Sequence, residues 1–102
     1  MITRIVRMAF RPEEVEAFLA IFRASSPQIR SFPGCHHLEL HQAPEDASIF
    51  FTLSHWDGPE ALEAYRQSAL FQTTWAQTKV LFREKPQAWS LALHHQVQPP
   101  AV

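Results

Sequence analysis

Glycine and cysteine are scarce in this sequence, which has two glycines and one cysteine among 102 residues. The glycines, Gly34 and Gly58, lie far apart, so the chain has no glycine-rich loop that could hold a nucleotide phosphate. Cys35 has no cysteine partner within the chain, which is compatible with a reducing compartment. We expect its side chain to be a small buried apolar group, since no activating base is evident.

An excess of charge of either sign is also missing. The formal net charge is -1, and acidic and basic residues are interspersed. This excludes the basic stripe that holds a nucleic-acid backbone. No apolar run approaches the roughly 18 to 20 residues that cross a bilayer, and the first residues are charged too early for a signal peptide. We therefore expect a cytoplasmic protein without nucleic-acid or membrane partners.

Apolar residues, by contrast, are abundant. They make up 46% of the chain, and aromatic residues make up 12%. A domain of this size buries only about two thirds of the surface that its unfolded chain exposes, so part of this apolar material is expected at a subunit interface. We predict one domain over residues 1–97 and a short flexible tail over 98–102.

The first third of the chain predicts a strand followed by a helix. Residues 2–10 are rich in β-branched and aromatic side chains. Pro12 suits the first helical turn, and the next apolar residues follow helical spacing: Val15, Phe18, Leu19 and Phe22. Pro27 is expected to break or kink this helix, and Phe32-Pro33-Gly34 to turn the chain into the next strand.

Residues 35–41 and 48–56 predict an antiparallel hairpin. If Leu40 lies opposite Ile49, side-chain alternation defines two faces. The apolar face then holds Leu38, Leu40, Ile49, Phe51 and Leu53. The mixed face holds Cys35, His37, Glu39, Phe50, Thr52 and Ser54.

The last third predicts a helix in two pieces and a final strand. Asp57 and Glu60 have capping-box spacing, and Ser68 is a candidate cap for a second piece. That piece has one apolar stripe, formed by Phe71, Trp75, Thr78 and Phe82. Pro86 is expected to end the helix before a strand over residues 88–96.

The order of elements is therefore β, α, β, β, α, β. It predicts an α+β ferredoxin-like fold, with two helices on one face of a four-stranded antiparallel sheet. The other face of this sheet has no cover from its own chain. Packing this face against a second copy would give a homodimer, a dimeric α+β barrel.

The histidines do not predict a metal site. Four of the six occur as adjacent pairs, and neighbouring residues on a strand point to opposite faces. His37, His41 and Glu39 could share one face, but surface or hydrogen-bonded histidines are the better explanation for them. We therefore expect no bound metal.

The aromatic residues after the hairpin are the better candidates for a site. Trp56, Tyr65, Phe71 and Trp75 could all line the gap between sheet and helices. They would either pack a filled core or form a pocket that stacks a flat ring. In a pocket, Trp56, Phe71 and Trp75 would bind the ligand, while His37, His55 or Tyr65 would orient it or transfer a proton.

The segment from Phe32 to Phe71 resembles the antibiotic biosynthesis monooxygenase family. It contains the Pro33-Gly34-Cys35 turn, an alternating strand, a second strand ending in Trp56, and a helix with Ser68-x-x-Phe71. The resemblance covers about residues 2–95 and implies the same fold and dimer. It also implies oxidation of a small aromatic phenol or quinol with molecular oxygen, without flavin, metal or other cofactor.

A heme-degrading branch of the same superfamily has an Asn on its first strand, a Trp on helix two and an axial His. Here strand one has no Asn, Tyr65 takes the Trp position and Trp75 the His position. Heme degradation is therefore not expected. Three hypotheses remain: a cofactor-independent monooxygenase, a non-catalytic small-molecule binding or sensing dimer, and a purely structural dimer with a filled core.

Overall fold

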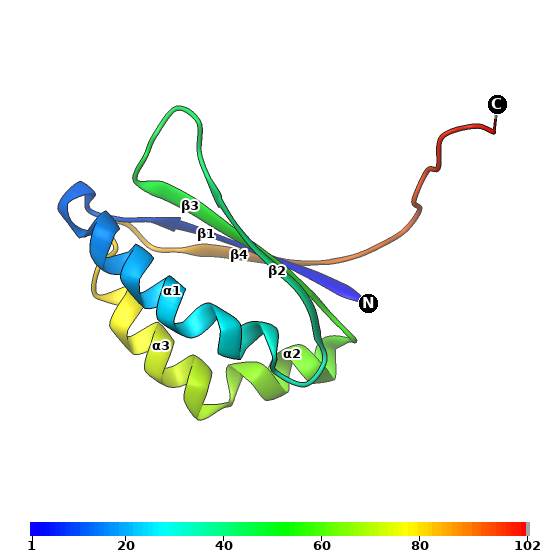
Figure 1. The fold of residues 1–102 in the computed structure, drawn as a ribbon, viewed down its shortest axis with the longest axis horizontal. Helices are drawn as coiled ribbons and strands as arrows, with labels where there is room; N and C mark the ends of the chain where they lie inside the picture. The colour runs from blue at the N-terminus through cyan, green and yellow to red at the C-terminus, as the bar shows by residue number, and fades with distance from the viewer. Residues whose placement is uncertain (102) are drawn as a thin grey trace.

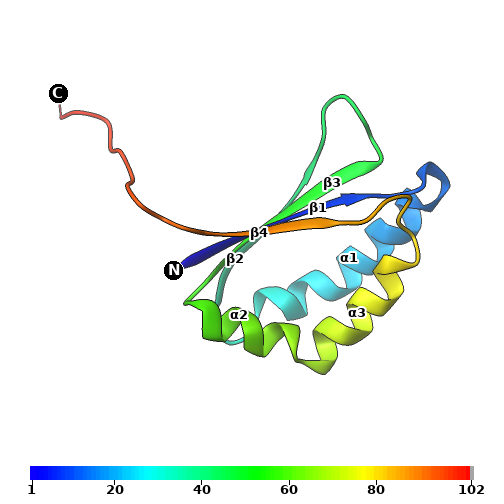
Figure 2. The same cartoon turned by 180° about the vertical axis from the view of Figure 1, so that it is seen from behind.

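The computed structural model describes residues 1–101 and has two layers. One layer is an antiparallel sheet of four strands in the order β2-β3-β1-β4. Its strands are β1 (Ile2–Ala9), β2 (Cys35–Gln42), β3 (Ile49–Trp56) and β4 (Gln87–Ala92). The helices all lie on one face of the sheet (Figure 1), and the same two layers are seen from behind (Figure 2).

The helical layer follows the predicted order. A 3-10 turn (Pro12–Glu14) leads into α1 (Val15–Arg30), and the segment after β3 forms α2 (Pro59–Arg66) and α3 (Ala69–Lys79). Ser68 caps α3, since its hydroxyl accepts a hydrogen bond from the Phe71 amide at 3.1 Å. The predicted ferredoxin-like arrangement is thus confirmed, with the second helix divided at the expected residue.

Two local predictions about the helices are wrong. Pro27 does not break α1, which continues to Arg30 and buries Ile29, while a kink at Pro27 stays a prediction. Proline lacks an amide donor, but the gain from burying the last turn outweighs one lost hydrogen bond. Asp57 does not cap α2: the cap is Gly58, and the Asp57 carboxylate instead pairs with the His36 imidazole.

The predicted register of the hairpin is also wrong. Leu40 lies opposite Thr52 rather than Ile49, a shift by an odd number of residues. Because side chains alternate along a strand, this shift changes which residues of β3 share a face with Leu38 and Leu40. The face toward the helices therefore carries Thr52 and Ser54. The other face carries His37, Glu39, Phe51, Leu53 and His55.

The interior has two apolar clusters at opposite ends of the helical layer. The larger contains Met8, Phe10, Phe18, Phe50 and Leu81. The smaller contains Cys35, Trp56 and Leu62, which confirms that the lone cysteine is buried. An irregularity in the β2–β3 register between Cys35 and His37 leaves Cys35 opposite Trp56 and His37 opposite His55.

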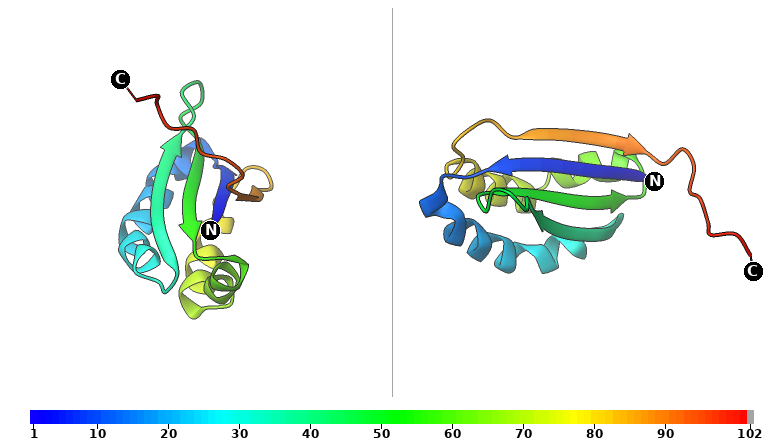
Figure 3. Two further views of the ribbon diagram at one scale, coloured as in Figure 1. Left: turned by 90° about the vertical axis from the view of Figure 1, so that its right-hand side faces the viewer. Right: turned by 90° about the horizontal axis from the view of Figure 1, so that it is seen from above.

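The sheet face away from the helices is uncovered within the described residues (Figure 3). Its apolar side chains include Ile5, Phe51, Leu53, Trp89 and Leu91, and we call this the outer face. Trp89 and Leu91 are 43% and 50% exposed. Such a patch on a small domain indicates an interaction surface.

The last strand is shorter than predicted. It ends at Ala92, which pairs with Ile2, the first residue of the neighbouring strand β1. Residues 93–101 have no strand partner and extend away from the body as an exposed segment (Figure 1). Residue 102 of the predicted tail lies outside the described residues. Within residues 1–101, no helix has the length and apolar character needed to cross a membrane.

Candidate functional site

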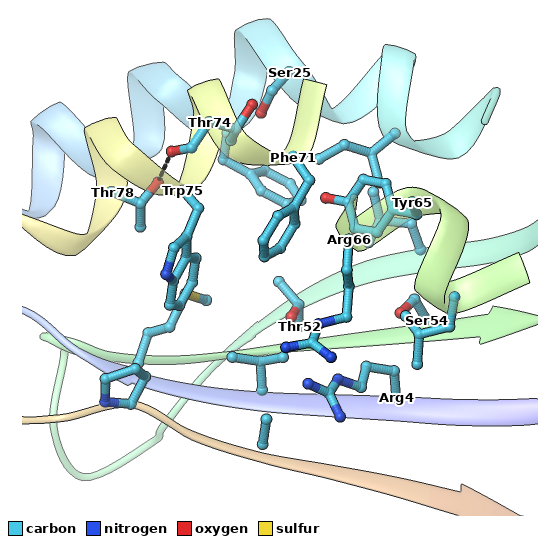
Figure 4. A pocket seen from close by; sticks show the side chains of 18 of the residues that line it. Arg4, Ser25, Thr52, Ser54, Tyr65, Arg66, Phe71, Thr74, Trp75 and Thr78 are labelled. Atoms are coloured by element: carbon cyan, nitrogen blue, oxygen red, sulfur yellow. Dashed lines mark hydrogen bonds between the residues drawn. The ribbon is translucent and has the colours of Figure 1, made fainter. Parts of the chain in front are cut away.

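A cavity of about 330 Å³ lies between the helices and the sheet (Figure 4). Its walls come from all four strands and all three α-helices. Every residue of β4 is exposed, because the helices leave that edge of the sheet uncovered. The cavity is therefore open on the β4 side. Its volume lies near the lower end of the range of about 300 to 1,000 Å³ that is typical of ligand pockets.

Four aromatic side chains line this cavity, Trp56 from the end of β3, Tyr65 from α2, and Phe71 and Trp75 from α3. Tyr65 stacks on Trp56 with ring centroids 4.9 Å apart, and Phe71 stacks on Trp75 at 5.8 Å. The Tyr65 and Phe71 rings meet edge to face at 5.2 Å. The sequence prediction that these four residues lie together is thus confirmed, while the cavity beside them is at odds with a completely filled core.

Trp56 supports the cavity wall rather than offering a surface to a ligand. Only 1% of the residue is exposed, and its indole nitrogen donates a 2.9 Å hydrogen bond to the Ser54 hydroxyl. Its ring fixes the plane of Tyr65 by stacking. Phe71 and Trp75 are only partly buried, so their rings are the ones that a ligand can contact.

The Tyr65 hydroxyl is the central polar group of the aromatic wall. Burial, with a smaller contribution from Cys35, raises the pKa of Tyr65 to about 12. Figure 4 shows this hydroxyl on the side of the ring that faces Phe71. Tyr65 is therefore a hydrogen-bond donor at neutral pH and not a general base.

Titration of this residue is a direct test, because Tyr65 is the sole tyrosine of the chain. We expect its phenolate absorbance to appear with a midpoint near pH 12 in the folded protein and near 10 after denaturation. Since folding raises the pKa, the Tyr65 contribution to the free energy of unfolding falls as pH rises between these values. A folded-state midpoint near 10 would show that the ring is solvated.

The two histidine candidates do not line the cavity. His37 and His55 lie on the outer face, with ring centroids 5.2 Å apart. Glu39 accepts hydrogen bonds there from His37 at 2.9 Å and from His41 at 2.7 Å. The shifted register accounts for the placement of His37, because the predicted register put His37 on the same face as Thr52 and Ser54.

The cavity also contains two cationic side chains that were not predicted from the sequence, those of Arg4 and Arg66. Arg4 lies on the helix-facing side of β1, opposite Ser54. Strand β1 carries arginine on both faces, so side-chain alternation alone does not show which arginine points inward. Arg66 ends α2 one residue after Tyr65, a position typical of a dipole-stabilising cation.

Comparison with known proteins agrees with this fold. The model of the family described as "Antibiotic biosynthesis monooxygenase" matches residues 1–77. No curated protein matches the chain by sequence.

Solved structures show the fold over nearly the whole chain. A crystal structure of an antibiotic biosynthesis monooxygenase is 18% identical, with a TM-score of 0.88 over 93% of this chain and 100% of that one. Rv0793 from Mycobacterium tuberculosis is 21% identical, with a TM-score of 0.86 over 95% and 98%. PA3566 from Pseudomonas aeruginosa is 23% identical, with a TM-score of 0.82 over 92% and 94%. At these identities the likeness establishes the fold alone.

Proposed function

Because the chain belongs to the antibiotic biosynthesis monooxygenase family, we propose that it is a cytoplasmic, cofactor-independent monooxygenase that oxidises a small aromatic phenol or quinol. The observation that supports this most directly is the open cavity, where the Phe71 ring lies beside Tyr65 and the Trp75 ring follows on the other side of Phe71. A flat aromatic ligand is the ligand class that such walls select.

The reaction needs no electrons from a cofactor. A phenol with a free para position can transfer four electrons to dioxygen, so that one oxygen atom enters the ring as the quinone oxygen and the other leaves as water. The phenolate is the electron-rich form that reacts, and its proton can pass to solvent through the opening beside β4. The protein then contributes binding, orientation and exclusion of most water.

Tyr65 has a defined role in this proposal. Its hydroxyl stays protonated at neutral pH and donates a hydrogen bond to the substrate oxygen. A hydrogen bond to the charged form of an acid lowers its pKa, so this donor favours the phenolate. Trp56 keeps the Tyr65 ring in place by stacking, and Phe71 and Trp75 hold the substrate ring.

We further propose that two copies associate through the outer face. The exposed apolar side chains of Trp89 and Leu91 extend the apolar patch formed by Ile5, Phe51 and Leu53. In a symmetric dimer, each copy would bury this patch against the same patch of the other copy. This burial would add the stabilisation that the thin core of one copy lacks. The homodimer leaves the cavity on the opposite side of each sheet accessible.

Oxygen consumption tests the proposed activity. Metal-free protein is incubated with a panel of hydroquinones, naphthols and anthrones, and oxygen uptake and product mass are measured against heat-inactivated protein. We expect protein-dependent uptake with a product carrying one added oxygen atom, and a large loss of rate in Tyr65→Phe. Absence of uptake for the whole panel, with tight binding retained, would contradict the monooxygenase proposal and support the non-catalytic binding dimer.

The two partly exposed tryptophans give a matched pair of variants for ligand binding. Trp75 lines the cavity and stacks on Phe71, whereas Trp89 lies on the outer face. Trp75→Ala should weaken binding of a naphthol by about tenfold or more, and Trp89→Ala should change it little. Affinity is measured by calorimetry, with circular dichroism as the check on folding. Equal losses of naphthol affinity in the two folded variants would show that the cavity is not the binding site.

A non-catalytic binding or sensing dimer is the second candidate. It is favoured by one observation: no histidine or carboxylate lines the cavity, so no residue there can act as a general base at neutral pH. The same lining suits the monooxygenase only if the substrate ionises easily. The oxygen-uptake experiment therefore separates the two functions.

A further inference from the structure

The cavity contains two positive charges and no negative one. Among its lining residues, Arg4 and Arg66 carry guanidinium groups, and none is Asp or Glu. Figure 4 shows the two guanidinium groups next to each other on the sheet side of the cavity, near Thr52, while Phe71 and Trp75 descend from α3. The site thus has an aromatic part and a cationic part.

Arg4 has no carboxylate partner within residues 1–101. Its guanidinium donates one hydrogen bond, of 3.0 Å, to the Ser90 hydroxyl on the neighbouring strand. Five N–H donors are available on a guanidinium, so most of them remain for another acceptor. Burial, followed by repulsion from Arg66, lowers the pKa of Arg4.

Arg66 is only loosely paired. Within residues 1–101 its one ionic contact is with Glu63, 3.4 Å away on the same helix, and both side chains are about half exposed. Glu63 also accepts a 2.8 Å hydrogen bond from the Gln67 amide. An exposed pair of this kind contributes little, typically less than about 1 kcal/mol, so it does not prevent Arg66 from binding a second anion.

We propose that the ligand of this cavity is an aromatic acid, whose ring lies against Phe71 and Trp75 and whose carboxylate is bound by Arg4 and Arg66. This inference rests on the cavity being the ligand site, as proposed above, but not on any oxidation there. A carboxylate between the two guanidinium groups would offset their mutual repulsion. It would also match the planar donor geometry that arginine presents to carboxylates.

The layout of the cavity supports a compact ligand of this kind. Ser90 belongs to β4, so the hydrogen bond from Arg4 places the cationic part at the open, solvated side. Phe71 and Trp75 form the apolar part. A carboxylate can thus stay partly hydrated while its ring is buried, which avoids most of the cost of removing a charge from water.

Two probes with the same rings test the proposal: a hydroxynaphthoate and the naphthol that lacks its carboxylate. Affinities are measured by calorimetry at neutral pH. We expect the native protein to bind the hydroxynaphthoate at least about tenfold more tightly than the naphthol. In Arg4→Gln and in Arg66→Gln the ratio of hydroxynaphthoate affinity to naphthol affinity should fall to about one, with naphthol affinity nearly unchanged. Arg23→Gln, an exposed change on α1 outside the cavity, is the charge-matched control and should keep the ratio.

A ratio near one in the native protein would overturn the proposal, as would a ratio that persists in both Arg4→Gln and Arg66→Gln. A fall of the ratio in Arg23→Gln as well would overturn it too, because the preference would then be a net-charge effect. These outcomes are independent of oxygen uptake. A carboxylate preference without oxygen uptake contradicts only the monooxygenase, and uptake without the preference contradicts only the aromatic-acid inference.

Discussion

Phe10→Ala should lower the free energy of unfolding by about 3–5 kcal/mol, the largest stability loss expected for a single residue here. Phe10 is completely buried and lies at the centre of the larger apolar cluster. Its ring stacks on that of Phe18, with ring centroids 4.2 Å apart. The centroids of the Phe82 and Phe50 rings lie 5.2 and 6.1 Å from that of Phe10. Helix α1, strand β3 and the segment after α3 thus lose packing at one point, and they cannot all move to fill the resulting cavity.

Chemical denaturation at one fixed protein concentration measures this effect, because association would otherwise change the apparent stability. Phe71→Ala is the matched control. It removes the same side chain from a partly exposed position beside an existing cavity, and should cost only about 1–2 kcal/mol. A cost for Phe10→Ala no greater than that for Phe71→Ala would show that the larger cluster does not dominate stability.

Ile5→Arg should separate the proposed homodimer into folded monomers. Ile5 lies at the centre of the outer face, between Leu53 on β3 and Trp89 on β4. An arginine there would place an unpaired charge in the middle of an apolar interface, next to Arg7 on the same face. The dimer dissociation constant should rise by roughly a hundredfold or more.

Light scattering over a range of protein concentrations gives the mass, and circular dichroism shows whether the chain stays folded. Ala24→Arg, which adds the same charge to the exposed surface of α1, is the control and should remain dimeric. A native protein that is monomeric at micromolar concentration would contradict the dimer proposal. A folded Ile5→Arg variant that is still dimeric would place the interface elsewhere.

Some structural features could be predicted from the sequence because they depend on neighbouring residues. The Ser68 cap is one, since its hydroxyl bonds to an amide only three residues away. The gathering of Tyr65, Phe71 and Trp75 is another, because helical spacing places them on the side of α2 and α3 that meets the sheet. Pro27 shows the limit of such local reasoning, since burial of the final turn of α1 outweighs its preference to end a helix.

The sequence by itself determined the order of strands and helices, the family, and the aromatic side of the cavity, because periodicity and turn residues are local signals. Only the tertiary structure decided which polar residues line the cavity. Pairing of β2 with β3 in a register three residues from the expected one placed His37 on the outer face, opposite His55, and away from Thr52 and Ser54. Pairing of β1 with β3 and β4 turned Arg4 inward. Register depends on packing over the whole sheet, and because side chains alternate along a strand, an odd shift exchanges the residues that face a ligand.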